Sequence, residues 1–337
     1  MSDDADYLWD KSGDDPEVAG LERLLGGFAH QAPLRAPPPR RRRAAFIAVS
    51  VVVVAAAVVI AVLLVRRGDE RGVQLAAVDG GAAPDGFGFQ VSGGAALCDG
   101  AAAHAGSAGT LRVGGWLETE VGATAVVQVA DIGEVRLKPG SRLRLVGTGP
   151  GEHRLELAHG RLSARVTAPP RLFVVDTPVA AAVDLGCAYD MEVDDAGQTH
   201  LRVTSGAVSL EGHGQASWVP WGHEVIAVPG RGPGTPVRSD APAVLRDALA
   251  RFDAGEGGGW SRSPLGIVVD EAGGQDAVTL WNLLTRTAGA DRAAVFARLD
   301  EVAIRPEWVL EEDVLAAQPQ ALESWRESLE GTWNLGP

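Results

Sequence analysis

One uncharged run of residues divides this chain. Ala44 to Val65 is 22 residues long, carries no charged side chain, and has Ser50 as its one polar member. A helix of this length rises about 1.5 Å per residue and can cross the hydrocarbon core of a bilayer, about 30 Å thick. A secretory signal peptide would begin nearer the start and end at a small-residue cleavage site, whereas this run follows 43 residues and ends at Arg66. The sequence therefore predicts a transmembrane helix over 44–65.

Basic residues on the two sides of this span predict its orientation. Positive charge accumulates on the cytoplasmic side of membrane helices. More arginines precede the span than follow it: Arg35 and Arg40 to Arg43 before, and Arg66, Arg67 and Arg71 after. We therefore expect a single-pass protein of a bacterial inner membrane, with residues 1–43 in the cytoplasm and the C-terminal region in the periplasm. Residues 66–96, rich in Gly, Ala and Asp, are expected to form a flexible linker.

The cytoplasmic segment is acidic and contains a short amphipathic helix. Residues 1–30 hold eight acids and two bases, a formal charge of −6. Asp15 followed by Pro16 is a typical helix start, and apolar residues then recur at helical spacing. One interpretation is that this stripe binds a protein partner with a basic surface; the other is that the segment lies on the membrane or stays disordered. The candidate partner-binding residues are Trp9, Val18, Leu21, Leu25 and Phe28.

The charge and motif content disfavour nucleic-acid binding and catalysis. The chain has 30 basic against 44 acidic residues, a net charge of −14, and no basic stripe, so no direct contact with nucleic acid is expected. It has no nucleophile motif, phosphate-binding loop or metal-ligand spacing, so we expect no enzyme activity, no cofactor and no metal site. Its two cysteines, Cys98 and Cys187, are too few for a disulfide scaffold. They could form one bridge, or Cys187 could be a buried free thiol.

Two further domains follow from the periodicity of apolar residues. Residues 97–235 show short runs of period two separated by turns, with glycines at Gly140, Gly160, Gly206 and Gly222. This repeated unit predicts mainly antiparallel β structure that is rolled or solenoid-like, rather than one flat sheet. Residues 240–337 return to helical spacing and predict a small α-helical domain of about four helices, one of them capped by Asp291.

Several segments of the β region, in order, resemble one known family. They are Gly115 to Ala125, Val135 to Leu145, Gly160-Arg161-Leu162, Phe173 to Pro178, Val183 to Tyr189, and Val203 to Val208. Together they resemble the FecR domain of bacterial membrane-bound sigma-factor regulators. Gly186-Cys187-Ala188-Tyr189 replaces the usual Gly-Thr-x-Phe of that family, and the C-terminal α/β module of its iron-transport members is not recognisable here.

The resemblance implies a non-enzymatic regulator, an anti-sigma factor or related protein. Its cytoplasmic end would bind an extracytoplasmic-function sigma factor, and its periplasmic β domain would receive a signal from an unknown envelope molecule or protein. The alternative is a membrane-anchored periplasmic module that binds or scaffolds cell-wall glycan or an envelope protein, with residues 1–43 serving only as a flank of the membrane span.

Overall fold

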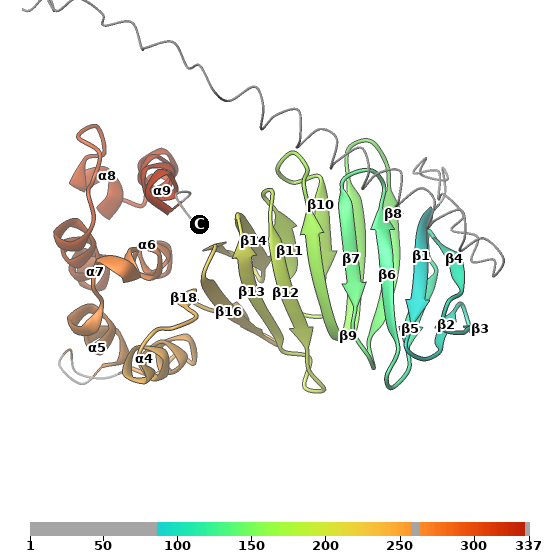
Figure 1. The fold of residues 1–337 in the computed structure, drawn as a ribbon. Helices are drawn as coiled ribbons and strands as arrows, with labels where there is room; N and C mark the ends of the chain where they lie inside the picture. The colour runs from blue at the N-terminus through green and yellow to red at the C-terminus, as the bar shows by residue number, and fades with distance from the viewer. Residues whose placement is uncertain (1–85, 258–259, 261–262, 334–337) are drawn as a thin grey trace, which may run out of the picture. The chain divides into compact units, whose positions relative to one another are not determined.

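The computed structural model describes residues 86–257, 260 and 263–333 of the chain. The predicted transmembrane helix over 44–65, the cytoplasmic segment 1–43 and linker residues 66–85 lie outside these residues. Within the described part, no helix combines the length and the apolar character needed to cross a membrane. That part comprises a β domain followed by a helical domain (Figure 1).

The β domain is built from strands between Gly86 and Arg238. It begins earlier than the sequence predicted, because β1 lies inside the segment 66–96 that was expected to be a linker. The apolar side chains of β1 are buried, but Gly86 and Gly88 make its sequence resemble a flexible spacer. The strands are β1 Gly86–Ser92, β2 Ala96–Cys98, β3 Ala101–Ala103, β4 Ala108–Arg112, β5 Trp116–Thr119, β6 Thr124–Val129, β7 Gly133–Leu137, β8 Arg142–Thr148, β9 His153–Val166, β10 Phe173–Asp176, β11 Ala181–Asp184, β12 Ala188–Val193, β13 Thr199–Ser205, β14 Ala207–Gly212, β15 Gln215–Pro220, β16 His223–Val228, β17 Gly232–Pro233 and β18 Val237–Arg238.

These strands form two sheets that share the long strand β9. The first sheet runs β4-β1-β6-β7-β9-β12-β13-β16, with β17 and β18 both paired to β16. The second runs β3-β2-β5-β8-β9-β10-β11-β14-β15. All pairs are antiparallel except β9 with β10. The rolled, mainly antiparallel arrangement predicted from the sequence is therefore confirmed.

Glycines turn the chain from one sheet to the other. Gly140, Gly160, Gly206 and Gly222 have φ values of 67°, 88°, 67° and 76°, which favour glycine because a Cβ is strained there. At Gly206 a Cβ would also lie 2.1 Å from the carbonyl oxygen of Gly186. The strands that flank these turns do not pair with each other: β7 pairs with β6 and β9, and β8 with β5 and β9. At Gly160 there is no break at all, because β9 continues through it from one sheet into the other.

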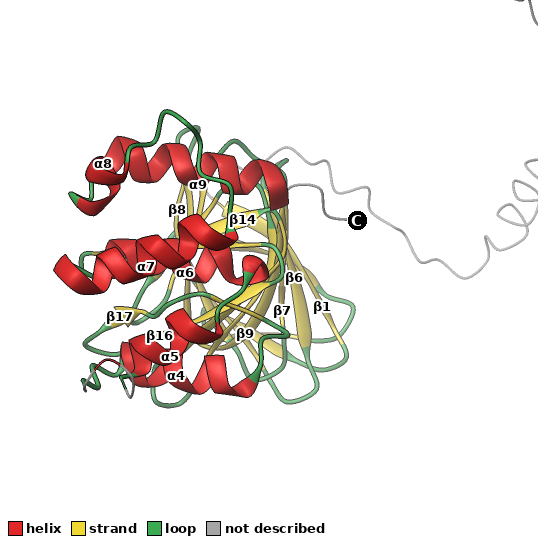
Figure 2. Cartoon of the chain, turned by 90° about the vertical axis from the view of Figure 1, so that its left-hand side faces the viewer, coloured by secondary structure: helices red, strands yellow, loops and turns green. Residues whose placement is uncertain are grey.

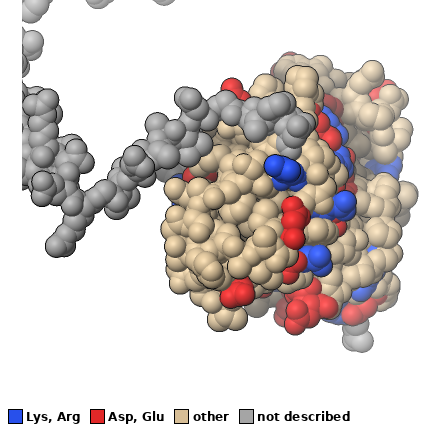
Figure 3. All heavy atoms as spheres, turned by 90° about the vertical axis from the view of Figure 1, so that its right-hand side faces the viewer, with Lys and Arg blue, Asp and Glu red and all other residues tan. Residues whose placement is uncertain are grey.

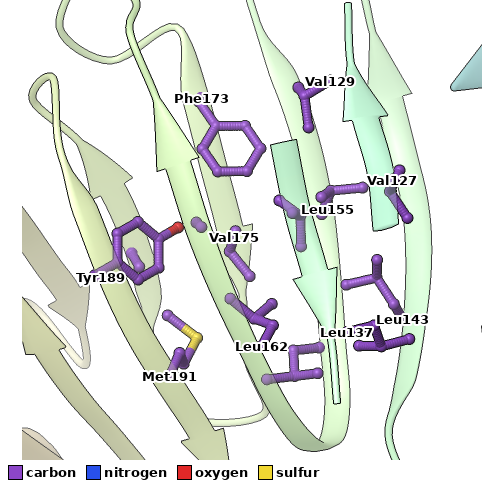
Figure 4. Close-up of a cluster of buried hydrophobic side chains, with 14 of the residues drawn as sticks. Val127, Val129, Leu137, Leu143, Leu155, Leu162, Phe173, Val175, Tyr189 and Met191 are labelled. Atoms are coloured by element: carbon purple, nitrogen blue, oxygen red, sulfur yellow. The ribbon is translucent and has the colours of Figure 1, made fainter. Parts of the chain in front are cut away.

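Apolar side chains from the inner faces of both sheets form one core. Every second residue of the strands points inward, and most of these positions are Leu, Val, Ala or aromatic. Figure 4 shows part of this core, where Leu155 and Phe173 from one sheet meet Val127 and Leu162 from the other. All four are at most 1% exposed. Burial of this alternating pattern fixes the register of the strands, since a one-residue slip would expose the core face.

The C-terminal domain consists of helices α4 Ala243–Asp253, α5 Pro264–Glu271, α6 Ala277–Arg286, α7 Gly289–Val302, α8 Glu311–Leu315 and α9 Pro319–Trp333, with a 3-10 turn η3 Gly274–Asp276. The predicted helical domain is confirmed, and α4, α6, α7 and α9 correspond to its expected helices. α7 begins at Gly289, so Asp291 lies in its first turn and is not its cap. The sequence reading missed α5 and α8. α5 nevertheless carries clear start signals: the Ser263 hydroxyl accepts from the Gly266 N–H at 2.9 Å, and Pro264 occupies the first position.

The two ends of the β domain differ. The helices cover the end formed by β15 and β16 (Figure 2), and Trp218 of β15 belongs to the apolar core of the helical domain. Figure 3 shows the opposite end, where β1 to β4 lie; charged side chains gather along one side of this face, and much of the remainder is uncharged. The helical domain thus closes one end of the rolled sheets.

Candidate functional site

The junction between β15 and α6 is the most elaborate polar site of the described region. Asn282 of α6 is fully buried and points at the edge strand β15. Its side-chain oxygen accepts from the Trp218 N–H at 3.0 Å, and its side-chain nitrogen donates to the Trp218 carbonyl at 3.1 Å. An amide side chain thus supplies the bonds that a further strand would make, and the open edge of the sheet is satisfied there.

Arg286, at the end of α6, binds the same edge of the β domain. Its side chain is only 10% exposed. Nη2 donates to the Ser217 hydroxyl at 2.6 Å and to the carbonyl oxygens of Pro233 and Gly234 at 3.0 and 2.9 Å, while Nη1 donates to Gln215 at 3.1 Å. One guanidinium therefore ties α6 to β15 and β17. Burial lowers the pKa of Arg286, and the nearby charge of Asp253 opposes that change.

Asp253, the last residue of α4, makes a second polar connection to the β domain. Its carboxylate accepts from the Thr235 N–H at 2.7 Å and from the Thr235 hydroxyl at 2.8 Å, and it lies 3.9 Å from Arg286. Burial raises the pKa of Asp253, and the bonds from Thr235 and the charge of Arg286 lower it. A salt bridge between Arg246 of α4 and Glu224 of β16 adds a third connection.

Tryptophans fill the apolar part of the junction. The rings of Trp218 and Trp281 meet edge to face with their centroids 5.7 Å apart, and the Arg326 guanidinium lies 5.3 Å from the Trp218 ring centroid. Trp281 also donates to the Leu322 carbonyl at 3.0 Å, which joins α6 to α9. Aromatic pairs and cation–π contacts of this geometry stabilise a fold by more than the burial of their apolar surface accounts for.

A cleft of about 1360 Å³ runs along this junction. Its lining mixes arginines with carboxylates and includes Arg171, His200, Glu224, Asp247, Glu323 and Arg326. Such a lining suits a polar ligand or a peptide better than a compact apolar molecule. The residues from 86 to 333 that the structure describes contain no cluster of metal-ligating side chains.

A second polar cluster lies inside the β domain, at the corner between β11 and β12. Asp184 is 0% exposed; it accepts from the Gly186 N–H at 2.9 Å and from the Cys187 thiol. Burial raises the pKa of Asp184, although these hydrogen bonds lower it, and burial also raises the pKa of Cys187. The sequence indicated an unusual residue at Cys187 but gave no sign that a carboxylate would be its partner.

The structure corrects the disulfide alternative: Cys98 and Cys187 are both free. The Cys98 thiol faces the Thr110 carbonyl at 3.9 Å, whereas Cys187 faces Asp184. Strands β5, β8 and β9 separate β2 from β12. The two thiols thus have different neighbours, and no disulfide joins them in the structure.

The candidate partner-binding residues predicted in the N-terminal segment, Trp9, Val18, Leu21, Leu25 and Phe28, lie outside the described residues. The polar junction residues Asn282, Arg286 and Asp253 were not predicted as a site. A buried asparagine within the apolar run of α6 was the one available signal, because a polar side chain in such a run needs a partner.

Comparison with known proteins gives one family match. Residues 116–209, which run from β5 into β14, match the model of the FecR protein family. No curated protein matches the chain. Two crystal structures of a "putative anti-sigma factor" from Parabacteroides distasonis ATCC 8503 match at 18% sequence identity with a TM-score of 0.32; the match covers 40% of this chain and 64% of theirs. On the family match, residues 116–209 of this chain form a FecR domain.

Proposed function

We propose that this chain is a non-enzymatic transmembrane regulator of an extracytoplasmic-function sigma factor. The observation that carries the proposal is the FecR match over residues 116–209, since the resemblance drawn from the sequence places this domain in sigma-factor regulators. The uncharged span over 44–65 supports a membrane anchor, and the acidic apolar stripe of residues 1–43 supports a cytoplasmic partner site.

In this proposal the periplasmic region receives the signal and the anchor carries the response inward. The junction of β15 with α6 supports a role in reception, because Asn282, Arg286 and Asp253 hold the β domain and the helices together through buried polar contacts. A ligand that enters the adjoining cleft and binds one arrangement of these contacts more tightly would increase the fraction of molecules in that arrangement.

Co-purification with the candidate sigma factors of the same genome tests the proposal. The full chain should retain one of them, and a chain lacking residues 1–43 should not. Leu21→Asp combined with Leu25→Asp should weaken retention at least tenfold, because a charge on the apolar stripe cannot be buried against a partner. Glu22→Gln combined with Arg23→Gln is the matched control and should bind as the wild type. Failure of every sigma factor to bind the intact chain would refute the proposal.

The junction cleft, with its mixed charges, favours one alternative: a membrane-anchored periplasmic module that binds or scaffolds cell-wall glycan or an envelope protein. Transcription separates the two functions. Deletion of residues 1–30 should change transcription from sigma-dependent promoters if the chain is a regulator, and should leave it unchanged if residues 1–43 only flank the span.

A further inference from the structure

The connection between α7 and α8 exposes large apolar side chains to solvent. Ile304, Trp308 and Leu310 are 85%, 75% and 47% exposed. Exposed apolar groups concentrated in one place mark interaction surfaces on soluble domains. Tryptophan is also among the residues that most often carry the binding energy of an interface. Figure 1 shows α7 and α8 on the side of the helical domain that faces away from the sheets.

The backbone beneath these side chains is held in place. Arg305 Nη1 donates to the Val309 carbonyl at 2.6 Å and Nε donates to Asp300 at 2.7 Å, while the guanidinium lies 5.5 Å from the Phe296 ring centroid. Val309 is 1% exposed and anchors the connection in the core of the helical domain. Trp308 is therefore presented from an ordered loop, which lowers the entropy that a partner must overcome.

Glutamates flank the exposed apolar residues along the chain. Glu301, Glu307, Glu311 and Glu312 are all exposed. Arg298 pairs with Glu301 at 2.7 Å, whereas Glu307, Glu311 and Glu312 have no salt bridge to an arginine of the described region. Three of these four glutamates thus add negative charge that no arginine of the described region pairs with.

We propose that Ile304, Trp308 and Leu310 form a docking site for a protein partner that offers an apolar helix face flanked by lysine or arginine. Basic groups complement the three unpaired glutamates. Anionic lipid would be repelled by them. A second copy of this chain would bring the same acids against each other if the patch paired with itself. The site lies on the helical domain and does not depend on sigma-factor binding by residues 1–43.

Fluorescence anisotropy with a defined probe tests this site on the full chain in phosphatidylcholine nanodiscs. The probe is a labelled amphipathic helix with leucines on one face and lysines on the other; its counterpart carries glutamates in place of the lysines. The lysine probe should bind and the glutamate probe should not. Trp308→Ala should weaken binding about tenfold without loss of folding, because its side chain is mostly in solvent.

Two further variants complete the test. A triple variant should bind the lysine probe more weakly and with a smaller salt dependence, since charge attraction is screened by salt. It carries Glu307→Gln, Glu311→Gln and Glu312→Gln. Trp221→Ala removes a tryptophan that is 38% exposed on the β domain and should bind as the wild type. The proposal would be overturned if the lysine probe did not bind, or if Trp308→Ala left its binding unchanged. It would also be overturned if the chain dimerised through Trp308 in mass photometry, or floated with anionic vesicles in a manner that depends on Trp308.

Discussion

At the scale of single residues, Asp184 is the least expected feature of the β domain. It is completely buried, and its partners are a thiol and a backbone N–H rather than a cation. Removing an ionised carboxylate from water costs several kcal/mol unless it is fully compensated. Burial accordingly outweighs the hydrogen bonds and raises the pKa of Asp184. The thiol of Cys187, where the resembled family has threonine, still provides a donor to this carboxyl group.

The raised pKa of Asp184 predicts a specific pH dependence of stability. An unfolded aspartate loses its proton near pH 3.9, before the folded Asp184 does. Above that pH the unfolded state is therefore favoured increasingly, until the pH passes the pKa of the folded group. The free energy of unfolding of the wild type, minus that of Asp184→Asn, should fall across this window by about 1.4 kcal/mol per unit of pKa shift. Urea unfolding at several pH values measures it, and a difference constant with pH would contradict the prediction.

The two thiols should differ in reactivity. Cys187 is buried, and burial raises its pKa, so it holds little of the thiolate that reacts. Cys98 is only partly buried. In Cys98→Ser, the folded chain should show no reactive thiol with a disulfide reagent, and the denatured, unreduced chain should show one. In the wild type, denaturation without reductant should expose both thiols; finding neither would mean that they are bridged.

At the scale of elements, the corner glycines set where the chain passes from one sheet to the other. Substituting two of them distinguishes the cost of a positive φ from the cost of a steric clash. A Cβ at Gly222 meets nothing within 4 Å, whereas one at Gly206 would lie 2.1 Å from a backbone oxygen. Gly222→Ala should therefore cost only its positive φ, about 1–2 kcal/mol. Gly206→Ala must also displace the backbone at Gly186 and should cost about 3 kcal/mol or more. Thermal unfolding of the two variants tests this order, and equal losses would argue against it.

Asn282 predicts how strongly α6 is tied to the β domain. Asn282→Leu fits a similar volume but leaves the N–H and the carbonyl of Trp218 without their partners. Each unsatisfied buried group costs about 1–3 kcal/mol, so a loss of about 2–5 kcal/mol in the free energy of unfolding is expected. Thr285→Ala, at an exposed position of the same helix, should cost less than about 0.5 kcal/mol. Similar losses in the two variants would show that the Asn282 contacts contribute little.

Elements could be predicted where periodicity is strong and local. The alternation along residues 135–145 and the glycine turns pointed to a rolled β domain, and helical spacing pointed to α4, α6, α7 and α9. β1 was missed because Gly86 and Gly88 obscure its alternation, and α5 because it follows a glycine-rich stretch. Pairings such as Asn282 with Trp218 join residues that are 64 positions apart, and such contacts cannot be predicted from the local pattern of a single sequence.

At the scale of the whole molecule, the helical domain and the β domain share one continuous set of contacts. Ala207 and Trp218 of the β strands lie in the same apolar cluster as α4 to α9. Arg286 binds the backbone carbonyl oxygens of Pro233, in β17, and of Gly234, which follows that strand. A force or ligand acting on the helices would therefore reach β15 and β16 directly. Through Val309, which lies in the same apolar cluster, the loop that carries Trp308 is connected to these contacts.

Membrane topology is the whole-molecule prediction on which the proposed function rests. Five arginines before the span against three after it favour a cytoplasmic N-terminus. Alkaline phosphatase, which folds only when exported, should be active when fused after residue 337, and a conventional green fluorescent protein there should stay dark. Arg40 to Arg43→Gln leaves one arginine before the span against three after it, which reverses the bias, and should lower the phosphatase activity, whereas Arg35→Gln should change it less. Fluorescence from the C-terminal fusion of the unaltered chain would place the FecR domain in the cytoplasm and exclude reception of a periplasmic signal.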